Sequence, residues 1–162
     1  MRTVSQRLVM FASLLVVPAA TEVPSLSATL PKPETDPRLV RLQQFLAERD
    51  CPIEKYASDF IEAADAHDLD WRLLPSISFV ESGGGKQYTN NNVFGWDSCR
   101  QRFASIRDGI HTVASRLANS QLYRNKDLEG KLRTYNPVAD HYPALVKSVM
   151  RSIAPTPALA VN

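Results

Sequence analysis

The chain has 162 residues, of which 44% are hydrophobic and 22% charged, with a formal net charge of +2. This length fits one domain, alone or with a targeting segment, and is too short for a large α/β barrel or a two-domain dinucleotide enzyme. The near-average composition excludes a collagen, a coiled-coil rod and a wholly disordered chain, and two cysteines are too few for a disulfide scaffold.

Residues 1–20 have the pattern of an export signal. Arg2 and Arg7 give a charged start, residues 8–17 are an apolar run, and small residues suited to cleavage follow. The run is shorter than the roughly 17–25 apolar residues of a membrane-spanning helix, so we expect no transmembrane span after cleavage. An uncleaved amphiphilic anchor is the alternative. The predicted location is the periplasm or the extracellular space.

Removal of residues 1–20 takes away two arginines and no acid, which leaves basic and acidic residues in equal number. A nucleic-acid binder normally carries a basic patch on a positively charged domain, so we expect no nucleic acid as a partner. Acidic residues predominate up to Glu81 and basic residues from Lys86 onward. This distribution is typical either of two solvated helical faces or of a cleft with one acidic and one basic wall.

Proline-rich segments flank a single predicted domain. Residues 21–37 contain four prolines and are predicted to form an extended linker. Residues 154–162 contain two more and are predicted to be a flexible tail. Residues 38–153 show no internal repeat and form the domain, which we expect to be a monomer.

Apolar residues at helical spacing predict three helices in the first half of this domain. The first follows Pro37 and the second covers residues 54–67. The third runs from Asp70, as its N-cap, to Glu81. Pro75 is expected to distort its first turns, because proline lacks an N–H and its ring crowds the preceding turn.

Three more helices are predicted in the second half. Ser105 and Asp108 fit a capping box at the start of the first of them. Residues 127–135 and 140–153 carry the patterns of the other two. No segment alternates like a half-buried strand, so the predicted fold class is all-α.

Glu81 carries the strongest chemical signal, because it ends a nearly all-apolar helix and precedes three glycines. Apolar neighbours and the negative end of the helix dipole both raise the pKa of such a carboxyl. A carboxyl that stays protonated acts as a general acid toward a leaving oxygen. The glycines would let a polymer approach closely. The alternative is a surface glutamate before an ordinary glycine stop.

A second polar run follows, Asn90-Asn91-Asn92-Val93-Phe94-Gly95-Trp96. Amide side chains donate and accept hydrogen bonds, and an indole offers a flat apolar face of the kind on which sugar rings stack. The run therefore favours a carbohydrate site. The alternative is an asparagine-rich turn that leads into a buried Phe94 and Trp96.

Two segments together resemble a known family: Glu81-Ser82-Gly83-x-Gly85-Lys86 and Asn91-Asn92-x-Phe94-Gly95. They are similar to the bacterial endo-β-N-acetylglucosaminidase (mannosyl-glycoprotein endo-β-N-acetylglucosaminidase-like) family of the lysozyme superfold. The likeness extends over residues 57–150 and includes Tyr135-Asn136-Pro137 and Tyr142-x-x-x-Val146. It implies a lysozyme-like helical domain with a two-lobed substrate cleft, acting on peptidoglycan.

The resemblance also implies that a tyrosine near Pro137 faces the acid. We favour Tyr142 as the auxiliary catalytic residue and place Tyr135 among the substrate-binding residues. A tyrosine hydroxyl orients water or the acetamido group of the substrate, and substrate-assisted routes need no second carboxylate. Packing at a helix entrance is the alternative for both tyrosines. Asp97 is a further candidate carboxylate, although aspartates at such places are commonly turn formers.

Cys51 and Cys99 are predicted to form a disulfide, because the chain is predicted to be exported. A cysteine nucleophile is the rival interpretation, with Cys99 paired to His111 or His141. The three histidines, His67 included, lack the i, i+4 pairing of a helical zinc site. We therefore predict no metal and no cofactor.

Taken together, these patterns predict an exported peptidoglycan hydrolase that cleaves β-1,4 glycosidic bonds of glycan strands as an endo-β-N-acetylglucosaminidase, with Glu81 as general acid and Tyr142 as its auxiliary. The predicted substrate-binding residues are Asn91, Asn92, Phe94, Trp96 and Tyr135. A non-catalytic peptidoglycan-binding or cell-wall assembly module of the same fold is the alternative, followed by a cysteine-nucleophile wall amidohydrolase. The choice among glucosaminidase, muramidase and transglycosylase stays open at this point.

Overall fold

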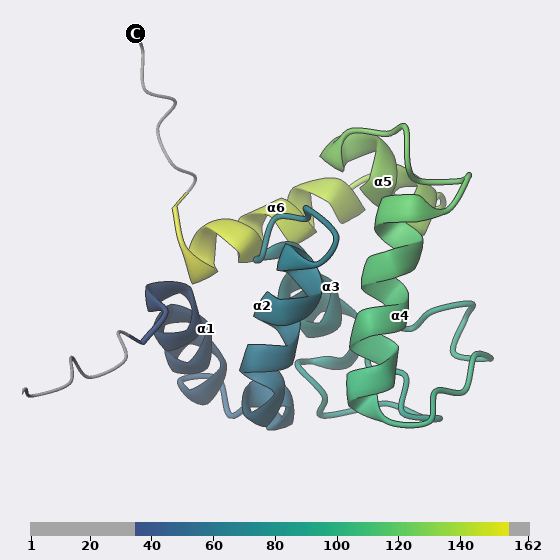
Figure 1. Cartoon of the computed structure of the whole chain (residues 1–162). Coiled ribbons are helices and arrows are strands. Elements are labelled where there is room, and N and C mark those ends of the chain that lie inside the picture. The colour runs from purple at the N-terminus through teal and green to yellow at the C-terminus, as the bar shows by residue number, and fades with distance from the viewer. Residues whose placement is uncertain (1–34, 156–162) are drawn as a thin grey trace, which may run out of the picture. The chain divides into compact units, whose positions relative to one another are not determined.

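The computed structural model of the chain describes residues 35–155 (Figure 1). The predicted export signal and most of the predicted linker and tail lie outside this part. Within it the chain forms six α-helices and one 3-10 segment, η1, with no strand beyond an isolated bridge between Thr89 and Asn92. The predicted all-α class is therefore confirmed. The elements are α1 (Pro37–Ala47), η1 (Pro52–Tyr56), α2 (Ala57–Asp65), α3 (Leu73–Ser82), α4 (Ile106–Asn119), α5 (Leu128–Tyr135) and α6 (Tyr142–Ile153).

The first helix begins inside the segment predicted as linker. Pro37 is the first residue of α1, a position where its missing N–H costs nothing, and the carboxylate of Asp36 caps the helix by accepting the N–H of Arg38 at 2.8 Å. The predicted helix over residues 54–67 divides into η1 and α2. At α4 the N-cap half of the predicted capping box is present, because the Ser105 hydroxyl accepts the N–H of Asp108 at 3.0 Å. The Asp108 carboxylate accepts the N–H of Ala104 at 3.1 Å in place of that of Ser105.

Asp70 does not cap α3, contrary to the sequence-based prediction. Its carboxylate accepts the backbone N–H of Arg72 at 3.0 Å and the side-chain Nε at 2.9 Å, and the helix begins only at Leu73. Arg72 is 6% exposed and donates to the carbonyl of Ala154 at 2.8 Å, so Ala154 belongs to the folded domain and not to a flexible tail. Pro75 lies in the first turn of α3, where an N–H has no intrahelical acceptor, and the helix continues through it.

α3 and α6 pack against each other and run antiparallel, as two hydrogen bonds between their opposite ends show. The Arg72 bond joins the start of α3 to the end of α6, and a bond between Tyr142 and Glu81 joins the start of α6 to the last turn of α3. α2 packs against both α1 and α4 and lies between them in Figure 1. Among residues 35–155, no helix is long and apolar enough to cross a membrane. The largest fully buried side chains are Phe60, Phe94, Leu42, Leu46, Ile53, Leu74, Ile77, Ile110, Leu117, Leu132, Val93 and Val113.

The predicted disulfide between Cys51 and Cys99 is wrong, because both thiols are free. Cys51 is buried before η1, and its sulfur occupies the space beside Gly84, where an added Cβ would overlap it. Cys99 is exposed on the loop between α3 and α4. Burial raises the pKa of the Cys51 thiol, which keeps it protonated and unreactive.

We therefore expect the native protein to react with a thiol reagent such as dithionitrobenzoate at one site, Cys99, and at two sites after unfolding. Cys99→Ser should abolish the fast reaction, while a reducing agent should leave the melting temperature of the wild type unchanged. Absorbance at the reagent's product band measures both. If the unfolded, unreduced protein shows no free thiol, the two cysteines are bonded and the assignment of two free thiols is contradicted.

Candidate active site

A cleft of about 700 Å³ lies at the C-terminal end of α3. It is lined from α3, from the loop between α3 and α4, from α4, and from the segments around α5. The lining residues are Glu81, Gly95, Trp96, Asp97, Ser98, Gln101, Arg116, Tyr123, Tyr135, Asn136, Pro137 and Val138.

The Glu81 carboxyl lies at the inner edge of this cleft. Its Oε1 accepts a hydrogen bond from the Tyr142 hydroxyl at 2.7 Å. Burial raises the pKa of Glu81 above its ordinary value, and the bond from Tyr142 offsets part of this rise. Burial and the neighbouring Glu81 raise the pKa of Tyr142, so its hydroxyl stays a neutral donor. The pair is therefore an acid with an elevated pKa whose orientation is fixed by one donor.

Gly95 lies next to Oε2, the other oxygen of the Glu81 carboxyl. A Cβ on Gly95 would lie 2.7 Å from Oε2 of Glu81, and the residue has a left-handed φ of +62°. Glycine is needed here for two reasons, since a side chain would be strained in this conformation and would displace the carboxyl. Sequence reasoning included Gly95 only as part of a motif and did not assign it this role.

The sequence predicts that the three glycines after Glu81 let a polymer approach the site. In the structure they have a different role. Gly83 ends α3 in the left-handed conformation. A Cβ on Gly85 would lie 2.6 Å from Cγ2 of Ile53, and the carbonyl of Gly84 accepts the N–H of Ile53 at 3.2 Å. The glycines instead let the chain before and within η1 pack closely against the end of α3.

The asparagine run organises the loop between α3 and α4. The amide of Asn90 donates to the carbonyl of Cys99 at 3.2 Å, and that of Asn91 to the carbonyl of Phe103 at 3.0 Å. Asn92 is 1% exposed and holds Trp96 twice, donating to its carbonyl at 2.9 Å and accepting its N–H at 3.0 Å. The prediction that Asn91 and Asn92 line a sugar floor is corrected, because their amides are used by the loop itself.

Phe94 does not line the cleft either, although the sequence predicts it among the substrate-binding residues. Its ring is fully buried and packs edge-on against Phe60, with centroids 6.3 Å apart. Neighbouring residues of this segment face different environments: Phe94 points into the core, whereas Gly95 and Trp96 line the cleft.

Trp96 and Tyr135 do line the cleft, and they belong to a connected group of rings. The centroids of Trp96 and Tyr135 are 5.4 Å apart, and Tyr135 stacks on Tyr142 at 5.9 Å with 5° between the planes. Tyr123 lies 5.9 Å from Trp96, and the guanidinium of Arg116 lies 5.5 Å above the indole. Sequence reasoning missed Arg116 and Tyr123, because nothing local marks them as cleft residues.

Asp97 is the second carboxylate among the lining residues. It is exposed, has a left-handed φ of +52°, and accepts from Nη2 of Arg100 at 2.6 Å. This engagement fits the turn-forming interpretation of Asp97. Within residues 35–155 the thiol of Cys99 has no hydrogen bond to a histidine, so the structure gives no support to a cysteine–histidine pair.

No known family model matches this sequence, and no curated protein matches it either. The chemistry open to the cleft is therefore that of its own groups. It presents an acid with a raised pKa, a tyrosine hydroxyl held on that acid, and aromatic rings beside it. This set suits proton donation to a bulky neutral substrate with apolar faces.

A comparison of Gly95→Ala with Gly83→Ala should isolate the contact between Gly95 and the carboxyl. Both variants place a side chain at a left-handed φ, and a Cβ on Gly83 would lie no closer than 3.6 Å to Lys86. We expect Gly83→Ala to lose about 1–2 kcal/mol of unfolding free energy in urea because of its left-handed backbone. Gly95→Ala should lose more, because its side chain also displaces the Glu81 carboxyl. Only Gly95→Ala should also shift the ¹³C carboxyl resonance of Glu81. Equal effects of both variants on that resonance would contradict the proposed role of Gly95.

Proposed function

We propose that this protein is an exported peptidoglycan hydrolase, an endo-β-N-acetylglucosaminidase with a lysozyme-like domain and a two-lobed cleft, in which Glu81 is the general acid. The observation that carries the proposal is the Glu81 carboxyl: it is desolvated at the end of an apolar helix, opens into a cleft, and is held by Tyr142 at 2.7 Å. The residues that resemble the glucosaminidase family include this pair.

In the proposed reaction the Glu81 proton passes to the glycosidic oxygen as the C1–O bond of the sugar breaks. Because Oε1 accepts from Tyr142, the proton is carried on Oε2, the oxygen beside Gly95. The missing side chain of Gly95 leaves room for the leaving oxygen to approach Oε2. Tyr142 thus orients the acid and leaves its reactive oxygen free.

The positive charge that develops at C1 needs a partner. Asp97 is held by Arg100 and supplies no obvious nucleophile. The 2-acetamido group of an N-acetylglucosamine unit can perform this role itself, so the proposal assigns a substrate-assisted route in which water then completes hydrolysis. A substrate with an acetamido group next to the broken bond is therefore required.

The aromatic rings are assigned to substrate binding. Trp96 and Tyr135 line the cleft beside the acid and offer apolar faces to pyranose rings. Arg116, Gln101 and Asn136 add polar groups within the same cleft for hydroxyl and amide groups of the glycan. Peptidoglycan lies outside the cytoplasmic membrane, which fits the export signal predicted for residues 1–20.

The direct test is Glu81→Gln, which keeps the size of the side chain but cannot donate a carboxylic proton. We expect the rate of clearing of a purified cell-wall suspension to fall by about 10²–10⁴-fold while the melting temperature at neutral pH stays equal or rises. Glu54→Gln, outside the cleft, is the matched control and should clear at the wild-type rate. Chromatography of the products should show new reducing N-acetylglucosamine ends.

Four results would contradict this assignment. Clearing by Glu81→Gln at the wild-type rate would make Glu81 structural, and binding of cell walls without clearing by either protein would favour the non-catalytic wall-binding module. Reducing N-acetylmuramic acid ends would indicate a muramidase, and 1,6-anhydro ends a transglycosylase.

Tyr142→Phe should change the pH dependence of clearing. The hydrogen bond from Tyr142 lowers the pKa of Glu81, so its removal should raise that pKa further. Because the acid must be protonated, the wild-type rate falls as the pH rises through this pKa, and in the variant the fall should begin at a higher pH. Rate–pH profiles of the two proteins measure the shift. If the rate of the variant begins to fall at the same pH as that of the wild type, or at a lower pH, Tyr142 does not act on the acid.

A further inference from the structure

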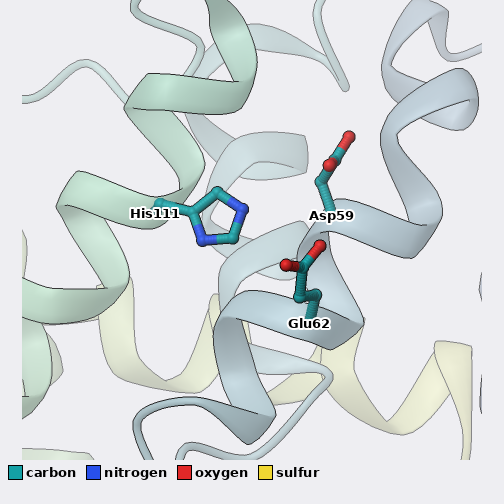
Figure 2. A group of neighbouring side chains, drawn as sticks. All are labelled: Asp59, Glu62 and His111. Atoms are coloured by element: carbon teal, nitrogen blue, oxygen red, sulfur yellow. The ribbon is translucent and has the colours of Figure 1, made fainter.

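A second group of chemically active side chains lies outside the cleft, between α2 and α4. Asp59 and Glu62 are three residues apart on α2, and His111 lies on α4, which packs against it. One ligand atom from each of the three lies within 4.8 Å of the others. Figure 2 shows the imidazole of His111 directed across the interhelical space toward the two carboxylates.

The ring nitrogen Nε2 of His111 is buried and has no hydrogen-bond partner. A buried polar atom without a partner is destabilising and calls for an explanation such as a bound ion. The carboxylates, by contrast, are already engaged: Arg107 donates to Asp59 at 2.8 Å and to Glu62 at 3.1 Å. Its side chain is 58% exposed, so it can leave toward solvent.

We propose that Asp59, Glu62 and His111 form a binding site for a divalent cation of the zinc type, in which Nε2 of His111 and one oxygen of each carboxylate are the protein ligands. One imidazole and two carboxylates are a known ligand chemistry for Zn²⁺, and a water would complete four-coordination. The two negative charges balance the ion, which takes the place of the Arg107 guanidinium.

The geometry requires a small adjustment. Tetrahedral ligands at 2.0–2.2 Å from zinc lie about 3.4 Å from one another, whereas these atoms span up to 4.8 Å. Glu62 is exposed and can rotate to close this difference, while Asp59 is held more tightly, with its side chain 15% exposed. The bound ion would fasten α2 to α4, and α4 carries Arg116 in the wall of the cleft.

The first experiment is calorimetric titration of the tag-free full chain with ZnCl₂ after chelator treatment. It is made in a Cys99→Ser background, because an exposed thiol also binds zinc. We expect one equivalent to bind, and the melting temperature to rise by several degrees when free zinc exceeds the dissociation constant 100-fold. Asp59→Asn and His111→Ala should each weaken binding at least tenfold. His67→Ala, which removes a histidine outside the group, should leave binding unchanged.

The variant Arg107→Gln distinguishes a zinc site from a cluster that has only a structural role. It removes the competing cation, so zinc should bind more tightly than to the parent protein, whereas loss of a purely structural ion pair would not improve binding. If His111→Ala does not fold, ¹⁵N spectra of the parent protein replace it: zinc should shift Nε2 of His111 and leave His67 and His141 in place. The proposal is overturned if no zinc binds at 1 mM, if zinc shifts the other histidines instead, or if His67→Ala weakens binding as much as His111→Ala.

Discussion

The hydrogen bond from Tyr142 to Glu81 depends on the antiparallel packing of α3 against α6, and the orientation of the Glu81 carboxyl in the cleft depends on that bond. At the far end of the same helix pair, Arg72 joins the start of α3 to the carbonyl of Ala154 after α6. These two links fix the register of the helices. A slide of either helix by one turn, about 5.4 Å, would separate the acid from its donor. Packing in the core therefore decides whether the carboxyl has its partner.

The burial of Glu81 in this helix pair makes the stability of the fold depend on pH. Burial raises the pKa of Glu81, so the folded state holds its proton more tightly than the unfolded state does. The sign of the linkage follows: the favourable contribution is complete below the unfolded pKa and is lost as the pH rises through the folded one. Above that pKa the buried, charged carboxylate lowers the free energy of unfolding, and the apolar packing of α3 offsets this loss. A weak acid at this place is thus maintained by the core around it.

The loop between α3 and α4 reaches a defined shape without regular secondary structure. Buried backbone groups need partners, and here asparagine side chains supply them in place of a helix or sheet. Asn92 clamps both backbone groups of Trp96 and thereby holds the indole at the cleft, while Gly95 next to it fits against the acid. Asparagines predicted to touch a ligand instead hold the backbone of the loop that carries the cleft residues Gly95 and Trp96.

Sequence alone determined the features that depend on neighbours along the chain. Helical periodicity gave the all-α class, the Ser105 cap of α4 followed from local spacing, and the raised pKa of Glu81 was predicted from the apolar helix before it. Tertiary structure decided which of several chemically suitable side chains meet. It buried Phe94, kept Cys51 and Cys99 as free thiols, and brought His111 to the carboxylates of α2 across a long stretch of sequence. The physical reason is that these outcomes depend on how helices distant in sequence pack. A periodic pattern specifies which face of a helix is buried but not which residue of another helix lies opposite it.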